Sequence, residues 1–185
     1  MSTRTLALVG SLRAGSYNRQ LAESAVKHAP DGTDVEIFEG LADVPFYNED
    51  LDRPGVVPNS AQALRDAVKR AGALLLVTPE YNGSIPAALK NAIDWTSRPF
   101  GSGVIVDKPV AVVGTSGGRY GGVGDAHADI GHHARTITGS VYESIATIRT
   151  RSPQQSSSSP LTANECRPIR WRSQDHRTWP GCIYA

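Results

Sequence analysis

Three short runs of this 185-residue chain are apolar at every position, and segments with helical periodicity lie between them. The runs are residues 6–9, 73–77 and 110–113, and Val35 with Ile37 offers a further strand. A strand that is apolar throughout, instead of alternating with polar residues, is buried on both faces of its sheet. The sequence therefore predicts an α/β fold in which a parallel sheet carries helices on both faces.

The expected helices begin at recognisable residues. Asn18 is placed to cap the first helix, and Asn59 with Gln62 resembles a capping box at the start of the second. Pro86 fits the first turn of a third helix. A long polar loop, residues 39–58, precedes the second helix. Three acidic residues of this loop are expected to be exposed: Glu49, Asp50 and Asp52.

Composition and charge exclude several classes of protein. The 19 Lys and Arg residues against 18 Asp and Glu leave a net charge of +1, which gives no reason to expect nucleic acid or a membrane surface as a partner. No apolar run approaches the ~20 residues of a membrane-spanning helix, and the N-terminus lacks a signal-peptide core. The two cysteines form no CxxC pair, and no residue spacing matches a metal site. We therefore expect a cytoplasmic protein without a metal.

The composition changes along the chain. Residues 1–130 carry 12 basic and 15 acidic side chains, whereas residues 131–185 carry seven arginines, no lysine and three acidic side chains. A low-complexity run of Ser, Pro and Gln at residues 152–160 cannot build a packed element. We therefore divide the chain into a domain of residues 1–150 and an atypical tail of residues 151–185, which we expect to be disordered.

Three unusual loops follow the expected strands. They are residues 10–18, 78–84 and 114–124. Ligands of parallel sheets bind beyond the carboxyl ends of the strands, at the point where the strand order reverses. We therefore expect the functional site where these three loops meet.

The first loop is suited to an anion. It leads into a helix N-terminus, where unpaired backbone N–H groups and the helix dipole favour negative charge. Ser11, Ser16 and Asn18 can donate hydrogen bonds and Arg13 can add a charge-assisted one, so a phosphate fits. A nucleotide-binding P-loop does not fit, because Ser16 stands where its lysine is required, and no GxGxxG fingerprint occurs. The alternative is that these residues serve only as turn and capping residues.

The second loop places an aromatic ring, a carboxylate and an amide at one strand end. Tyr81 can face a planar ring, while Asn82 and the backbone around Gly83 can hydrogen-bond the edge of that ring. The alternative is a plain Asn-Gly turn beside an exposed tyrosine.

The third loop has six glycines in eleven residues, which lets the backbone approach a flat ligand closely. Residues 114–118 also satisfy the GxSxG pattern of serine hydrolases, so a hydrolase is a distant alternative. Its acid and histidine would have to come from residues 125–133, a stretch too short for the two groups to occupy separate strand ends, or from Asp175 and His176 in the unpatterned tail.

Three stretches together resemble the NADPH-dependent FMN reductases, a flavodoxin-like family that includes chromate, quinone and azo-dye reductases. They are residues 8–21 (LVGSLRAGSYNRQL), 78–95 (TPEYNGSIPAALKNAIDW) and 114–122 (GTSGGRYGG). Each is modest alone, but their order and spacing together are specific. The resemblance covers about residues 4–130, and it implies a doubly wound sheet of order 2-1-3-4-5 with FMN at the switch point.

The resemblance also implies a set of cofactor-binding residues. It places the FMN phosphate on the first loop: Ser11, Arg13, Ser16 and Asn18. It lines the isoalloxazine and the ribityl chain with the second loop: Pro79, Glu80, Tyr81, Asn82 and Gly83. It brings the third loop against the other side of the ring: Ser116, Gly117 and Gly118. No catalytic acid or base is assigned, because the chemistry belongs to the flavin.

The implied activity is a ping-pong oxidoreduction. NADPH or NADH reduces bound FMN, which passes the electrons to a quinone, an azo compound, chromate or free flavin. The alternative is an FMN-binding electron carrier, or a catalytically impaired flavoprotein. The resemblance further implies a homodimer or homotetramer, with the 39–58 loop and the helix near Asp94 and Trp95 at the interface.

The chain departs from the family after the third stretch, where a fifth strand and a final covering helix are expected. Residues 141–148 can supply the strand, but no amphipathic helix follows them. The tail, with arginine but no lysine, serine runs and scattered Trp and Cys, looks like the translation of an altered reading frame; a lineage-specific tail is the alternative. Either leaves one face of the sheet without its cover and exposes apolar surface.

Overall fold

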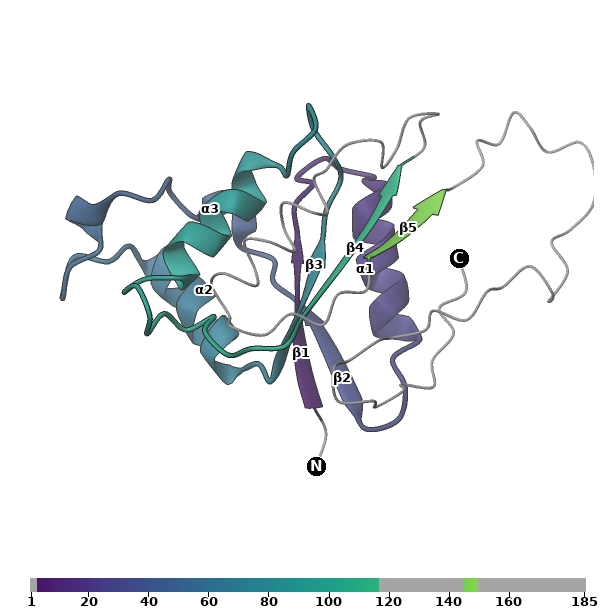
Figure 1. Ribbon diagram of the computed structural model, residues 1–185, viewed down its shortest axis with the longest axis horizontal. Helices are drawn as coiled ribbons and strands as arrows, with labels where there is room; N and C mark the ends of the chain where they lie inside the picture. Colours follow the sequence, from purple (N-terminus) through teal and green to yellow (C-terminus); the bar gives the residue numbers. More distant parts are fainter. Residues whose placement is uncertain (1–2, 117–144, 150–185) are drawn as a thin grey trace, which may run out of the picture.

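The computed structural model describes residues 3–116 and 145–149. Its centre is a five-stranded sheet in which every strand runs parallel to its neighbours (Figure 1). The strands are β1 (Thr3–Val9), β2 (Thr33–Ile37), β3 (Ala73–Val77), β4 (Val110–Ser116) and β5 (Ile145–Arg149). Their order, β2-β1-β3-β4-β5, confirms the predicted flavodoxin-like sheet. Because β1 pairs with β2 on one side and with β3 on the other, the strand order reverses between β1 and β3.

Helices pack on both faces of this sheet. They are α1 (Tyr17–Lys27), α2 (Asn59–Arg70) and α3 (Ala87–Thr96), with 3-10 helices at Leu41–Asp43 and Glu49–Leu51. α1 lies on one face, and α2 and α3 lie on the other (Figure 1). Successive strand residues point to opposite faces, so Leu6 and Leu8 pack in the core with α2 and α3, whereas Val9 packs with Ala22 of α1.

Two helix starts differ from the sequence prediction. Ser16, not Asn18, caps α1: its backbone is extended, and its hydroxyl accepts a hydrogen bond at 3.4 Å from the backbone N–H three residues on. Asn18 lies inside the first turn, and its side chain is engaged elsewhere. The capping box predicted from Asn59 and Gln62 does not form, because Pro58 occupies the cap position and no side chain caps α2.

The last two strands extend further than expected. β4 continues to Ser116, so the first three residues of the predicted third loop belong to the sheet. The strand expected within residues 141–148 is β5, which ends at Arg149. Gly117, Gly118, the acidic and histidine residues of 125–133 and the tail lie outside the described residues. Within the described ranges, no helix is long and apolar enough to cross a membrane.

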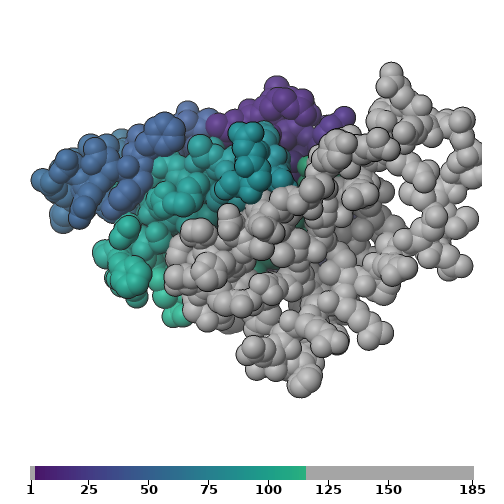
Figure 2. Space-filling view, turned by 45° about the horizontal axis from the view of Figure 1, so that its top comes forward, coloured from purple at the N-terminus to yellow at the C-terminus, as the bar shows by residue number. Residues whose placement is uncertain are grey.

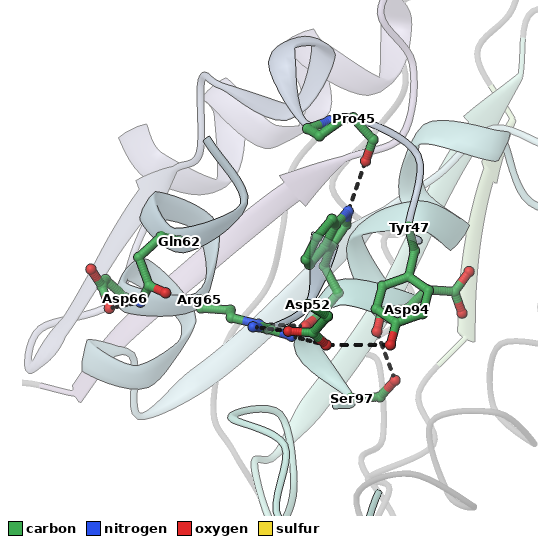
Figure 3. Close-up of polar contacts among 9 residues, drawn as sticks. Pro45, Tyr47, Asp52, Gln62, Arg65, Asp66, Asp94 and Ser97 are labelled. Carbon is green, nitrogen blue, oxygen red and sulfur yellow. Dashed lines mark hydrogen bonds and ion pairs between the residues drawn. The ribbon is translucent and has the colours of Figure 1, made fainter. Parts of the chain in front are cut away.

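The 39–58 loop is anchored to α2 by an ion pair that is largely shielded from solvent (Figure 3). The two terminal nitrogens of Arg65 donate to the two carboxylate oxygens of Asp52 at 2.7 and 2.8 Å, and each side chain is 12% exposed. The planar guanidinium matches a carboxylate in this two-bond geometry. The expectation that Asp52 is exposed is therefore wrong, whereas Glu49 and Asp50 are exposed as expected.

The same loop is fixed to α3 by two side chains. Asn91 accepts a hydrogen bond from the Tyr47 N–H at 2.8 Å and donates to the carbonyls of Val44 and Pro45 at 3.2 and 3.0 Å. The fully buried Trp95 donates from its indole nitrogen to the Pro45 carbonyl at 2.7 Å (Figure 3). These contacts satisfy the backbone of a segment without regular structure, and the loop therefore packs as part of the core.

We predict that Asp52→Asn lowers the free energy of unfolding by about 2 kcal/mol at pH 7, because hydrogen bonds to a charged group are lost. Arg65 holds the pKa of the Asp52 carboxyl below its ordinary value of 3.8. The wild type therefore keeps this stability above about pH 4 and loses it as the pH falls further, and the variant lacks this part of the pH dependence. Urea unfolding at pH 3 to 7 measures both.

Asp50→Asn is the matched control, because this carboxylate pairs with Arg53 at the exposed surface and such pairs contribute little. Equal stability losses for the two variants would contradict the assigned role of Asp52.

Candidate functional site

The first and second loops meet at the switch point between β1 and β3. Val9 and Val77 are register partners, so the two strands end at the same level, and the Gly10 N–H donates to the Val77 carbonyl at 2.8 Å. Beyond this point the hydroxyls of Ser11 and Tyr81 lie 3.5 Å apart. In Figure 2 the purple residues of the first loop lie beside the teal residues that follow β3. The structure thus brings together the two described loops that the sequence singled out.

The first loop presents the N-terminus of α1. The Ser16 N–H donates to the Arg13 carbonyl at 3.2 Å, and Gly15 adopts the positive φ of +68° that this turn requires. The backbone N–H groups of Tyr17 and Asn18 come next and have no acceptor within the helix, as in any first helical turn. Ser16 itself is buried, with 2% exposure. The loop therefore caps α1 through Ser16 and offers backbone donors to an anion.

Arg13 lies at the exposed surface of the first loop. Its guanidinium donates to the Ala14 carbonyl at 3.2 Å and lies 5.9 Å from the centroid of the Tyr17 ring. Both contacts hold the charge beside the N-terminus of α1. A guanidinium has five N–H donors, so this contact to Ala14 leaves capacity for a phosphate.

Asn18 takes a position that the sequence did not indicate. The residue is 4% exposed, and its carboxamide is directed at the end of β4. Its nitrogen donates to the Thr115 carbonyl at 2.9 Å, and its oxygen accepts from the Thr115 N–H at 3.0 Å. These two hydrogen bonds to Thr115 already use one donor and one acceptor position of the Asn18 side chain. The predicted contact of this side chain with a phosphate stays a prediction.

The second loop forms the tight turn predicted for an Asn-Gly pair. Tyr81 and Ser84 exchange backbone hydrogen bonds at 2.8 and 3.1 Å, and the two residues between them have positive φ values, 53° at Asn82 and 75° at Gly83. The side chain of Tyr81 is half exposed at the end of β3. The turn thus fixes a tyrosine ring at the site edge, and the two interpretations of this loop are compatible. The other two predicted residues of the loop are half-buried: Pro79 and Glu80.

The third loop is described only at its start. Ser116 is the last residue of β4 and is paired in register with Arg149 of β5. A serine-hydrolase nucleophile requires a sharp turn from strand to helix at that serine. The ladder position places Ser116 at the end of the strand, and the residues that would form this turn lie outside the described residues, so the hydrolase stays a distant alternative.

Sequence reasoning missed the close packing at Gly10. A Cβ at this residue would lie 3.3 Å from atoms of Thr78, Pro86 and Leu89. The first turn of α3 therefore packs directly on the backbone where the first loop begins. The signal was present, since a glycine directly ends the first apolar run, but only the fold shows what approaches it.

The comparisons with known proteins agree with this geometry. The model of the NADPH-dependent FMN reductase family matches residues 3–142, and the chain belongs to this family. It is 46% identical over 121 residues to a quinone reductase of Pseudomonas putida, which covers 65% of this chain and 64% of the relative. A 2-hydroxy-1,4-benzoquinone reductase of a Burkholderia species is 42% identical over 121 residues, with the same two coverages. The chain thus spans a little less than two thirds of the length of these relatives.

Solved structures show the same fold. The flavoenzyme NAD(P)H:(acceptor) oxidoreductase FerB from Paracoccus denitrificans superposes with a TM-score of 0.66 and 34% sequence identity. The match covers 82% of this chain and 76% of that enzyme. The azoreductase AzrA has the same fold at 17% identity, with a TM-score of 0.57 and coverage of 80% of this chain and 87% of that one.

We predict that Gly10→Ala lowers the free energy of unfolding by about 1–3 kcal/mol, because the added methyl overpacks the contact with α3. Gly72→Ala is the matched control: its Cβ would meet only ordinary contacts at 3.5 Å, so we expect its stability to be unchanged or up to about 1 kcal/mol higher. Denaturant unfolding of the two variants measures the difference. Equal effects would contradict the close approach at Gly10.

Proposed function

We propose that this protein binds FMN at the β1/β3 switch point and catalyses hydride transfer from NAD(P)H to a small acceptor. The observation that carries the proposal is the meeting of an anion-binding helix N-terminus with an aromatic turn, marked by the 3.5 Å separation of the Ser11 and Tyr81 hydroxyls. FMN has a phosphate at one end and a planar ring at the other, so the two loops match its two ends.

The donor set of the first loop fits the FMN phosphate. Ser11 and Ser16 supply hydroxyls, Arg13 supplies a positive charge, and the first turn of α1 supplies backbone N–H groups. These donors lie at the positive end of the helix dipole, which further favours the dianion. In this proposal Asn18 contributes its backbone N–H to the same turn.

The second and third loops hold the ring. The Tyr81 side chain would lie against the ring, and the backbone N–H groups of the turn at Asn82 and Gly83 would hydrogen-bond its edge, where they favour negative charge. Ser116, at the end of β4, Gly117 and Gly118 are the residues that we propose to contact the other side of the ring; the two glycines lie outside the described residues. Bound FMN supplies the hydride-transfer chemistry, while the protein positions the ring and sets its electrostatic surroundings.

No protein acid or base is assigned to the reaction. Burial and the nearby Asp52 carboxylate raise the pKa of Tyr47, and burial lowers the pKa of Lys108. Neither side chain belongs to the three loops where the candidate site lies. Tyr47 contacts Asp52 in the anchored loop, and Lys108 donates to the Ala71 carbonyl at the end of α2. Their perturbed pKa values therefore belong to the packing of α2 and α3.

The acceptor that we propose is a quinone, since two of the relatives carry quinone reductase names. Azo compounds, chromate and free flavin are further test acceptors. In this proposal NAD(P)H and the acceptor would use one binding place in turn, and we therefore expect ping-pong kinetics.

We also propose that the protein is a homodimer or homotetramer. The 39–58 loop lies at one end of the described molecule, coloured blue in Figure 2, and carries Phe46 with 77% exposure. Phe100, beyond α3, is 87% exposed. The side chain of Trp95 is fully buried against the loop, so it supports this surface from below and does not lie on it.

Steady-state oxidation of NADPH by the purified, FMN-loaded full chain tests the activity. We expect turnover that depends on a benzoquinone, with parallel double-reciprocal lines when both substrates are varied. A protein that holds flavin and is reduced by NADPH but does not turn over with any of the four acceptors would be an electron carrier and would contradict the enzymatic proposal.

Arg13→Ala tests the position of the phosphate. We expect the Kd of FMN to rise about tenfold, because a charge-assisted hydrogen bond is lost, while the Kd of riboflavin stays unchanged. Arg4→Ala is the control, since Arg4 lies at the opposite end of β1 beside Asp34. Flavin fluorescence titration measures both ligands. An equal loss for FMN and riboflavin would contradict the assignment of Arg13.

A further inference from the structure

We propose that Asn18 is a positioning residue: its side chain ties the N-terminus of α1 to the end of β4 and thereby sets the phosphate-binding end of the site relative to the ring-binding end. The inference deepens the proposed function and rests on it for the identity of the ligand. The tie itself is made entirely within the chain.

The side chain of Asn18 continues the hydrogen-bond ladder of β4 beyond the end of β3. Along this edge β4 accepts from β3, with Leu74 donating to the Pro109 carbonyl at 2.8 Å and Thr78 donating to the Val113 carbonyl at 2.9 Å. Two residues further on, the N–H and carbonyl of Thr115 face the same side, but β3 has already ended. The Asn18 carboxamide takes both, with bonds of 3.0 and 2.9 Å. Its amide thus takes the place of the peptide group that a longer β3 would supply.

Burial makes this replacement necessary. Asn18 and Thr115 are 4% and 6% exposed, so water does not readily satisfy the Thr115 backbone. An unpaired buried N–H or carbonyl is strongly destabilising, because it loses its hydrogen bond to water and gains none in the protein. Only a side chain with a donor and an acceptor side by side satisfies both groups, and asparagine offers that pair on a short stem.

The two ends of the tie lie next to the two ends of the site. Asn18 is two residues after Ser16, the cap of α1, and Thr115 directly precedes Ser116. The two tied residues are 97 positions apart in the sequence. A shift of β4 relative to α1 would therefore change the distance between the phosphate donors and the ring contacts. Both ends of a bound FMN would be affected together.

This role predicts a pattern of Kd values that differs from the pattern expected if the Asn18 side chain bound the phosphate directly. We expect Asn18→Ala to raise the Kd of FMN and the Kd of riboflavin by the same factor, about tenfold, because the loop arrangement is lost and not a phosphate contact. Arg13→Ala gives the opposite pattern, a loss for FMN alone. Gln20→Ala removes a carboxamide from the exposed side of the same helix and should leave both Kd values unchanged.

Amide hydrogen exchange in the ligand-free full chain tests the tie independently of flavin. We expect the Thr115 N–H to be protected in the wild type and in Gln20→Ala, and its protection to fall at least tenfold in Asn18→Ala. If Asn18→Ala does not fold, the wild type alone decides. Protection at Thr115, together with slow exchange of the Asn18 side-chain amide protons, supports the tie, and rapid exchange at Thr115 overturns it.

The outcomes separate the two proposals. If Asn18→Ala loses affinity for FMN alone, Asn18 contacts the phosphate and the positioning role is overturned. Unchanged affinity for both flavins would also overturn the positioning role. A wild type that binds neither flavin would overturn the proposed function, while the exchange measurement would still decide whether the tie exists.

Discussion

The described structure depends on how backbone hydrogen bonds are satisfied where a parallel sheet ends. β1 and β3 finish at the same level, and the chain leaves them toward opposite faces, to α1 on one side and to α3 on the other. β4 is longer than β3 and extends beyond its end, so β3 does not pair with the last residues of β4. The Asn18 side chain satisfies that edge at Thr115, the hydroxyl of Ser16 accepts from the first turn of α1, and the turn after Tyr81 pairs with itself. The backbone donors that remain at this edge are available to a ligand.

The face of the sheet that α2 and α3 cover explains why the carboxyl ends of the strands can be polar and still be rigid. There the 39–58 loop is held by the Asp52–Arg65 pair and by the hydrogen bonds of Asn91 and Trp95. These contacts join the loop, α2 and α3 into one unit that packs on the sheet. Because the first turn of α3 also packs against Gly10, the loop that receives the phosphate in our proposal is supported from below by the main core. Loops on a rigid sheet can present donors with little ordering cost on binding.

Local patterns predicted what depends on neighbours in the sequence. The apolar runs predicted β1, β3 and β4, and the three motifs predicted the family, whose resemblance implies the strand order. Contacts between distant residues could not be predicted in this way. Asn18 fits a cap or a phosphate site equally well on local grounds, and only the approach of β4 shows its partner 97 residues away. Asp52 lies in a polar loop, and only the fold shows that its carboxylate pairs with Arg65, 13 residues further along the chain. The roles of Ser11, Arg13 and Tyr81 toward a ligand stay predictions.

The most direct test of the central claim is a crystal structure of the full chain with FMN. Our account predicts that the phosphate lies at the N-terminus of α1 beside Ser11, Arg13 and Ser16, and that the isoalloxazine lies against the turn at Tyr81. It also predicts that Asn18 keeps both hydrogen bonds to Thr115 in the complex. A flavin bound elsewhere, or one whose phosphate takes the Asn18 side chain away from β4, would contradict the account.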